Sequence, residues 1–491
     1  MTTNATREPI SKVDTAWLRM EQPTNLMMIN GIILMDEQLD YEKLLQTIEQ
    51  RFLTFRRFRQ KAVERTRGAY WELDEDFDIR SHVLRCALPG KADQAELQMF
   101  VSELASIPLN HARPLWQLHV VENYINGPVI VSRIHHCIAD GIALVQVFLS
   151  LTDPTPEGRP SARKPETWKK RRAQEARVFE RLITPARDGL DFATHLGQQM
   201  IAEGGRILEN PAIASQYATE ASEIVKELVH SLTLENDPET RFKGQLGTRK
   251  EVAWAEPMPL DEVKAVSKAL GCTVNDVLIA AVTGAIRQYM LSEGDSSEHL
   301  ADIRATVPVN LRPLEHAQEL GNHFGLVFLS LPLSADSPLE RLYTVQDRMN
   351  ELKSSKQAAV TLGFLAALGM GPSVLQKPVL DLLSQKASAV LTNVPGPQQP
   401  LYLAGSLMKE MMFWVPQNGN IGLGISILSY NGKVMFGLIS DRRLVAQPSR
   451  IISRFKPEFE KLLYLAMMLP LDGQPNPQTA AQLLENSPDP D

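Results

Sequence analysis

The stretch PVIVSRIHHCIADGIALVQVFLS, residues 128–150, decides how the chain is interpreted. Residues 129–134 are mostly β-branched and predict a buried strand, whereas residues 142–149 place apolar side chains at helical spacing. The strand therefore passes into a helix through residues 135–141, which open with two histidines. Because neighbouring side chains of a strand point to opposite faces, His135 and His136 cannot both face one cavity. One of the two is predicted to serve packing.

The loop HHCIADG at 135–141 has the residue types of a general-base site. The unperturbed pKa of histidine lies near neutrality, so a histidine at the end of a buried strand can act as a base in a cleft. Asp140 can cap the helix or pair with a distant arginine, and Gly141 leaves room for a substrate. The alternative is two core histidines beside a capping aspartate. The whole HHxxxDG pattern arises by chance with a probability on the order of one in a thousand, which favours function.

Length and composition predict two domains of mixed α and β structure. The chain has 491 residues, 44% of them hydrophobic, and its net charge of −7 argues against a general nucleic-acid binder. Cys86, Cys137 and Cys272 form no CxxC pair, so neither a disulfide framework nor a zinc site is expected. The first residues lack a signal-peptide pattern, and residues 358–375 favour a buried helix or channel lining over a membrane span. A cytoplasmic protein is predicted.

Five short patterns together carry a family resemblance. They are Pro114-Leu115-Trp116, HHxxxDG at 135–141, Val274-Asn275-Asp276-Val277, GNHFG at 321–325 and NVPGP at 393–397. Their order and spacing resemble the bacterial wax ester synthase/acyl-CoA:diacylglycerol acyltransferases, within the superfamily of CoA-dependent acyltransferases that carry HHxxxDG. The resemblance runs from Asp14-Thr15-Ala16-Trp17 to about Met468.

The resemblance implies an α/β fold of two chloramphenicol-acetyltransferase-like domains, with the active site in a tunnel between them. The predicted domains are 1–155, which carries HHxxxDG, and 246–472. A basic and helical crossover linker is predicted at 156–245, and the tail 473–491 is polar and predicted to be disordered.

The resemblance also implies roles for individual residues. His136 takes the proton of an acceptor hydroxyl, and Asp140 is architectural, as are His135 and Gly141. Asn275 begins a buried helix, where its amide suits a developing oxyanion or the substrate; ordinary capping is the alternative, to which Asp276 is assigned. Arg312 is the first candidate for the partner of Asp140, with a surface position as the alternative. The further tunnel candidates are Pro114, Leu115, Trp116, Gly321, Asn322, Phe324, Gly325, Asn393, Pro395 and Gly396.

The expected activity is acyl transfer from acyl-CoA to a fatty alcohol, giving a wax ester, or to diacylglycerol, giving triacylglycerol. Direct transfer in a ternary complex is predicted, because no activated nucleophile such as a GxSxG serine is present. No P-loop or GxGxxG fingerprint occurs, so nucleotide-dependent phosphate or redox chemistry is not expected. Neither a cofactor nor a metal is expected, and acyl-CoA enters only as substrate. Two alternatives stay open: a relative that acylates another alcohol or an amine, such as a polyketide-derived diol, and a lipid-binding relative without catalysis.

A dense basic run, SARKPETWKKRRAQEAR, surrounds Trp168 at residues 161–177. One interpretation of this run is a solvated linker helix. The other is a helix at 163–177 that rests on an anionic membrane or lipid-droplet surface, where each Lys or Arg contributes about 1 kcal/mol. The second interpretation would place the protein peripherally on the inner membrane or on lipid droplets.

Overall fold

The computed structural model describes residues 7–36, 39–65, 68–158, 234–311, 320–355, 357–358, 360–362, 381, 383–417 and 419–468. Several predictions lie outside the described residues: Arg312 as the partner of Asp140, the basic stretch 163–177, the tail 473–491 and the linker between 159 and 233. The helix predicted within 358–375 is described only at 358 and 360–362.

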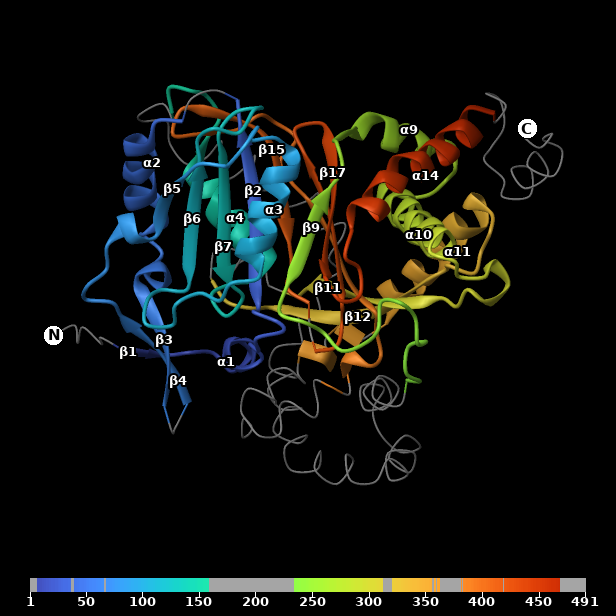
Figure 1. Ribbon diagram of the computed structural model, residues 1–491, viewed down its shortest axis with the longest axis horizontal. Coiled ribbons are helices and arrows are strands. Elements are labelled where there is room, and N and C mark those ends of the chain that lie inside the picture. Colours follow the sequence, from blue (N-terminus) through green and yellow to red (C-terminus); the bar gives the residue numbers. More distant parts are fainter. Residues whose placement is uncertain are drawn as a thin grey trace.

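A seven-stranded sheet carries the N-terminal half (Figure 1). Its strands, in spatial order, are β5 (Val83–Cys86), β6 (Trp116–Val121), β7 (Val129–His135), β2 (Met28–Met35), β15 (Ser406–Trp414), β14 (Tyr402–Leu403) and β8 (Thr152–Asp153). β7 is antiparallel to β6 and β2 and is buried along its whole length, as its β-branched sequence predicts. The strand that ends in the histidines therefore lies inside the sheet.

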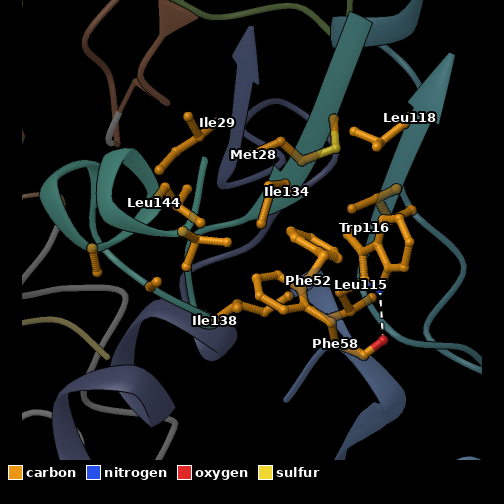
Figure 2. Close-up of a cluster of buried hydrophobic side chains, with 14 of the residues drawn as sticks. Met28, Ile29, Phe52, Phe58, Leu115, Trp116, Leu118, Ile134, Ile138 and Leu144 are labelled. Carbon is orange, nitrogen blue, oxygen red and sulfur yellow. Dashed lines mark hydrogen bonds between the residues drawn. The ribbon is translucent and has the colours of Figure 1, made fainter. Parts of the chain in front are cut away.

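Each face of this sheet buries its own core. On one face, α4 (Gly141–Leu151), α2 (Tyr41–Thr47) and the π-helix Ile48–Phe52 pack over Ile134 and its neighbours (Figure 2). In this core the indole N–H of Trp116 donates to the carbonyl of Phe58 at 2.8 Å. On the other face, α3 (Gln94–Ala105) covers the remaining side chains of β7. Burial on both faces fixes the direction in which each histidine at the end of β7 points.

A second seven-stranded sheet forms the C-terminal half. Six strands follow the order β10 (Met258–Pro259), β17 (Lys433–Asp441), β16 (Leu423–Tyr430), β13 (Ala389–Pro395), β11 (Ile303–Asn310) and β12 (Phe324–Leu331), and β9 (Lys250–Trp254) also pairs with β17. β16 and β17 meet at Asn431 and Gly432, whose φ angles of +48° and +73° suit a type I′ turn. The Asn431-Gly432 pair is a typical sequence for such a hairpin turn.

Four helices gather beside the second sheet (Figure 1): α9 (Leu260–Ala269), α10 (Val274–Ser292), α11 (Pro338–Ser354) and α14 (Ser449–Met468). The buried ion pair Arg341–Glu458, at 2.6 Å, joins α11 to α14, and Gly284 of α10 leaves room for the carboxylate. None of the described helices is by itself long and apolar enough to cross a membrane, although α9 and α10, bent by 100°, satisfy the length and composition criteria together.

One long strand from the later part of the sequence belongs to the sheet of the N-terminal half. β15 lies late in the sequence but pairs with β2, so that Trp414 opposes Asn30 and Phe413 opposes Gly31. The domain boundaries drawn from the sequence stay a prediction, but hydrogen bonding assigns residues 402–414 to the N-terminal sheet. A strand from late in the sequence is therefore part of the sheet of the N-terminal half, between β2 and β14.

A small antiparallel sheet and several short helices complete the N-terminal half. The small sheet contains β1 (Arg7–Pro9), β4 (Gly68–Leu73) and β3 (Gln60–Arg65), and α1 (Lys12–Arg19) follows β1. The 3₁₀ segments are Arg56–Arg59, Ile79–Ser81 and, in the C-terminal half, Ser297–His299. α1 begins at Ser11, whose side chain accepts from the N–H of Asp14, and this start brings Trp17 toward the end of β7.

Candidate active site

The two histidines at the end of β7 point to different surroundings, as the strand geometry predicts. His135 is fully buried, and its Nδ1 accepts the backbone N–H of Cys137 at 3.1 Å. Its Nε2 lies 3.5 Å from a carboxylate oxygen of Glu21, which also contacts His111 Nε2 at 2.6 Å. Burial raises the pKa of Glu21, but hydrogen bonds from the two histidines outweigh it and lower the pKa to about 2. His135 is thus occupied in holding the loop.

His136 lies between aromatic rings on the opposite side. Its imidazole stacks on the indole of Trp17, with ring centroids 4.2 Å apart and an interplanar angle of 15°, and Phe324 packs at 5.6 Å. The His136 backbone N–H donates to the carbonyl of Met27 at 2.7 Å, and its carbonyl accepts from Asn322 Nδ2 at 2.8 Å. Both the ring and the backbone of His136 are therefore held in place.

His136 forms part of the wall of a cavity of about 140 Å³ between the two halves. Trp17, Asp140 and Gly141 line it with His136 from the N-terminal half, and the walls from the C-terminal half come mainly from β11, β12 and β13 and the end of β15. Apolar side chains such as Phe328 dominate those walls. This arrangement suits an alkyl chain with a reacting group next to the imidazole.

Burial determines the protonation state of His136. It lowers the pKa of the imidazole to about 4, although the charge of Asp140, the backbone of His136 itself and the side chain of Asn322 act in the opposite direction. A histidine with this pKa is neutral at pH 7 and can accept a proton.

Asp140 fixes the loop through its two carboxylate oxygens. Its Oδ1 accepts the N–H of Ala143 at 2.8 Å and so caps α4, and its Oδ2 accepts the N–H of His323, from the other half, at 3.0 Å. Arg312 lies outside the described residues, so its pairing with Asp140 stays a prediction. These two hydrogen bonds agree with an architectural Asp140 that ties the histidine loop to the C-terminal half.

Three glycines lie at or beside the site and serve different purposes. Gly141 lines the cavity, and a Cβ built on it would meet no atom within 4 Å, so the space beside it is open. At Gly325 of β12, a Cβ would lie 1.7 Å from the carbonyl oxygen of Ala358. Gly321 has a φ of +118°, a conformation that glycine adopts without strain.

The predicted Asn-Asp pair at the start of α10 divides into two roles. Thr273 and Asp276 form a capping box at the start of α10, so both residues are architectural. Asn275 does not line the described cavity, but its Oδ1 accepts from Nδ2 of Asn393, which does, at 2.7 Å. The oxyanion role of Asn275 stays a prediction.

The remaining tunnel candidates separate into wall, support and core. Phe324 and Asn393 line the cavity, whereas Asn322, Gly321, Gly325, Pro395 and Gly396 lie beside it on the segments that carry wall residues. Pro114, Leu115 and Trp116 are buried in the core of the N-terminal sheet and are not among the residues lining this cavity. Their position is that of packing residues that support β7, because Trp116 opposes Ile134 across the ladder.

The residues that the sequence did not mark as functional come from α1 and its neighbours. Trp17 stacks on His136, and Asp14 accepts two hydrogen bonds from Asn322, at 2.8 and 2.9 Å. Arg57 pairs with Asp14 at 3.4 Å and donates to the carbonyl of Ile138 at 2.9 Å. The Asp14-Thr15-Ala16-Trp17 pattern was the only sequence signal for Asp14 and Trp17, and Arg57 had none.

Within the described ranges, no group of three or more His, Cys, Asp or Glu side chains could hold a metal ion. That the protein uses no metal stays a prediction.

Solved structures with the same architecture identify the fold. The wax ester synthase/diacylglycerol acyltransferase from Marinobacter aquaeolei VT8 superposes with a TM-score of 0.65 at 20% identity, over 94% of this chain and 100% of that one. The first condensation domain of the calcium-dependent antibiotic synthetase superposes with a TM-score of 0.58 at 14% identity, over 95% and 97% of the two chains. The chain therefore has the two-domain, chloramphenicol-acetyltransferase-like fold, which confirms the predicted fold class.

Sequence comparison then identifies the family. Residues 10–278 match the sequence model of the wax ester synthase/diacylglycerol acyltransferase catalytic domain, and residues 320–463 match that of the WS/DGAT C-terminal domain. The Mycobacterium tuberculosis protein named "Probable diacyglycerol O-acyltransferase tgs1" is 25% identical over 87% of this chain and 89% of its own length. A second one, tgs2, is 28% identical over 80% and 83%. The chain belongs to the wax ester synthase/diacylglycerol acyltransferase family and is an acyltransferase enzyme, as the sequence predicts.

Proposed function

We propose that the protein moves a long-chain acyl group from acyl-CoA to the hydroxyl of a fatty alcohol or of diacylglycerol, with His136 as general base. One observation carries this proposal: a buried imidazole, whose pKa burial lowers to about 4, forms part of the wall of an apolar cavity that both halves line. An alkyl chain can occupy the apolar part while its hydroxyl reaches the imidazole. Holding two substrates in this geometry supplies much of the rate enhancement, and the base contributes about 10²- to 10⁴-fold.

The proposed reaction is a direct transfer. His136 accepts the hydroxyl proton as the hydroxyl oxygen attacks the thioester carbonyl carbon. The carbon–sulfur bond then breaks, the proton passes from the imidazolium to the departing sulfur, and CoA leaves as the thiol. Cys137 is fully buried, and burial raises the pKa of its thiol, so the adjacent cysteine does not suit a covalent acyl carrier.

We propose the side-chain amide of Asn275 as the hydrogen-bond donor to the oxyanion. Because Asn275 Oδ1 accepts from Asn393, the amide orientation of Asn275 is fixed with its N–H₂ group turned away from that bond. A preorganised donor of this kind contributes roughly 3 to 4 kcal/mol to a transition state.

The substrate classes set the test of the proposal. Purified protein is mixed with palmitoyl-CoA and either hexadecanol or dioleoylglycerol, CoA release is measured, and the ester is identified by mass spectrometry. Stoichiometric ester and CoA with one of the two acceptors supports the proposal, and release with neither acceptor contradicts it. A covalent acyl-protein trapped by acid quench would contradict direct transfer while leaving the acyltransferase activity in place.

We further propose that the protein rests on an anionic lipid surface through the basic stretch 163–177. The support is the density of Lys and Arg around Trp168 in the sequence. In a liposome flotation assay, neutralising Lys169, Lys170, Arg171 and Arg172 should abolish flotation with anionic vesicles. Undiminished flotation would favour the solvated-linker alternative.

A further inference from the structure

One residue of the C-terminal half reaches across the domain boundary to the backbone of His136. Asn322 is 3% exposed, and its Nδ2 donates to the carbonyl of His136 and to Asp14 Oδ1, both at 2.8 Å. The backbone N–H of Asn322 donates to the same Asp14 oxygen at 2.9 Å. Both amide hydrogens are therefore engaged, and the orientation of the amide is determined by its partners.

The remaining atom of that amide is an acceptor without a donor. Asn322 Oδ1 is buried and has no hydrogen-bond partner, and the same is true of Nδ1 of His136. Burial is the main cause of the low pKa of His136, and the Asn322 side chain is among the groups that act in the opposite direction. The amide therefore lies next to the imidazole, and the two unsatisfied atoms complement each other if Nδ1 carries the proton.

The location of that proton decides which ring nitrogen can act as the base. A neutral imidazole carries one proton, and only the other nitrogen has the lone pair that accepts a proton from substrate. The acceptors beside the ring are the carbonyl of His136, which Asn322 Nδ2 holds, and Asn322 Oδ1 itself. Nδ1 is the ring nitrogen that is buried without a partner, so a proton there can be shared with these acceptors, and the lone pair is then left on Nε2. Where the group that orients a catalytic histidine is changed so that the wrong tautomer forms, the rate falls by up to about 10⁴-fold.

We propose that Asn322 is a positioning residue that sets the tautomer of His136, and that Asp14 anchors it in turn. This inference rests on the proposed role of His136 as general base. Arg57 completes the arrangement, since it pairs with Asp14 and also donates to the carbonyl of Ile138 in the histidine loop. The C-terminal half thereby controls the chemistry of a histidine that the N-terminal half supplies.

The tautomer can be observed without any substrate. In protein labelled with ¹⁵N-histidine, long-range proton–nitrogen correlation spectra distinguish a protonated Nδ1 from a protonated Nε2, and His136→Gln assigns the signal. The wild-type protein is expected to show Nδ1 protonated and Nε2 unprotonated. In Asn322→Ala the signal should move toward a mixture of the two tautomers, and kcat should fall about 10- to 10²-fold with KM within about threefold.

Asn123→Ala is the matched control, because the Asn123 side chain also makes two hydrogen bonds to backbone, both with Leu88, and has no contact with His136. It should leave the tautomer and kcat unchanged. If Asn322→Ala does not fold, Asn322→Ser, which keeps a donor for Asp14 but removes the amide oxygen, gives the same readouts.

An unchanged His136 tautomer in a folded Asn322 variant would overturn the proposal, as would a wild-type signal with Nε2 protonated. Failure of the proposed function has a different signature: the wild-type protein would show the expected tautomer but release no CoA with either acceptor.

Discussion

The pH dependence of the reaction follows from the burial of His136. Its pKa is lowered to about 4, mainly because burial disfavours the imidazolium. The neutral base therefore makes up about 90% of the enzyme at pH 5, whereas a histidine with the ordinary pKa of 6.5 would be only about 3% neutral at that pH. The account predicts that kcat/KM at pH 5 stays within about twofold of its value at pH 7.5, and a solvent-exposed base would lose about 30-fold.

The assay needs a detector of CoA that works in acid, such as chromatographic separation of CoA from acyl-CoA, with the acceptor alcohol held well below KM. The experiment must also control for unfolding at low pH. Between pH 6.5 and about 4 the unfolded chain binds a proton at His136 that the folded chain does not, so the free energy of unfolding falls as the pH falls through this window. Circular dichroism at each pH separates this loss from a loss of rate.

A midpoint of the acid limb near 6.5, in protein that remains folded, would refute the reasoning. It would mean that water reaches the imidazole in the free enzyme, or that another group is the base. A midpoint below about 5 would agree with a base buried between Trp17 and Phe324.

Two substitutions test the supports of the site. Gly325→Ala places a Cβ 1.7 Å from the carbonyl oxygen of Ala358, so β12 and the segment that contains Ala358 must separate. Urea unfolding should show that the free energy of unfolding falls by more than about 2 kcal/mol. A fall of less than about 0.5 kcal/mol would contradict the packing. Asp140→Ala removes the cap of α4 and the Asp140 oxygen that accepts the N–H of His323, for an expected loss of about 2 to 4 kcal/mol in the same measurement. Asp140→Asn keeps one acceptor and should lose less; equal losses would argue against the cap.

Local patterns in the sequence are sufficient to predict individual elements. The β-branched run before His135 predicts β7, and the Asn431-Gly432 pair predicts the hairpin between β16 and β17, because each signal depends only on neighbouring residues. The opposite orientations of His135 and His136 also follow from strand geometry alone.

Sheet membership could not be predicted in the same way. β15 mixes apolar and polar residues without strict alternation, and its partner β2 lies near the other end of the chain. Nothing local to residues 406–414 specifies that pairing, since it depends on how the two halves fold together.

Within the site, the sequence predicted the histidine but only part of its surroundings. His136, Asp140 and Gly141 lie on one short loop, so a motif can mark them together. The stacking of Trp17 on the imidazole is a tertiary contact made by a residue more than a hundred positions away, and no spacing rule reveals it. Leu115 and Trp116 show the converse, because a pattern shared with a family can mark packing rather than a cavity wall.

The central claim is that the second histidine, and not the first, does the chemistry. The most direct test is kcat of His136→Gln, measured by CoA release with palmitoyl-CoA and the preferred acceptor, in protein whose folding is verified by circular dichroism. The account predicts a loss of at least about 10²-fold for His136→Gln, while His135→Gln, measured alongside, loses stability but retains kcat per folded molecule. A folded His136→Gln variant with a rate near that of the wild-type protein would contradict the account.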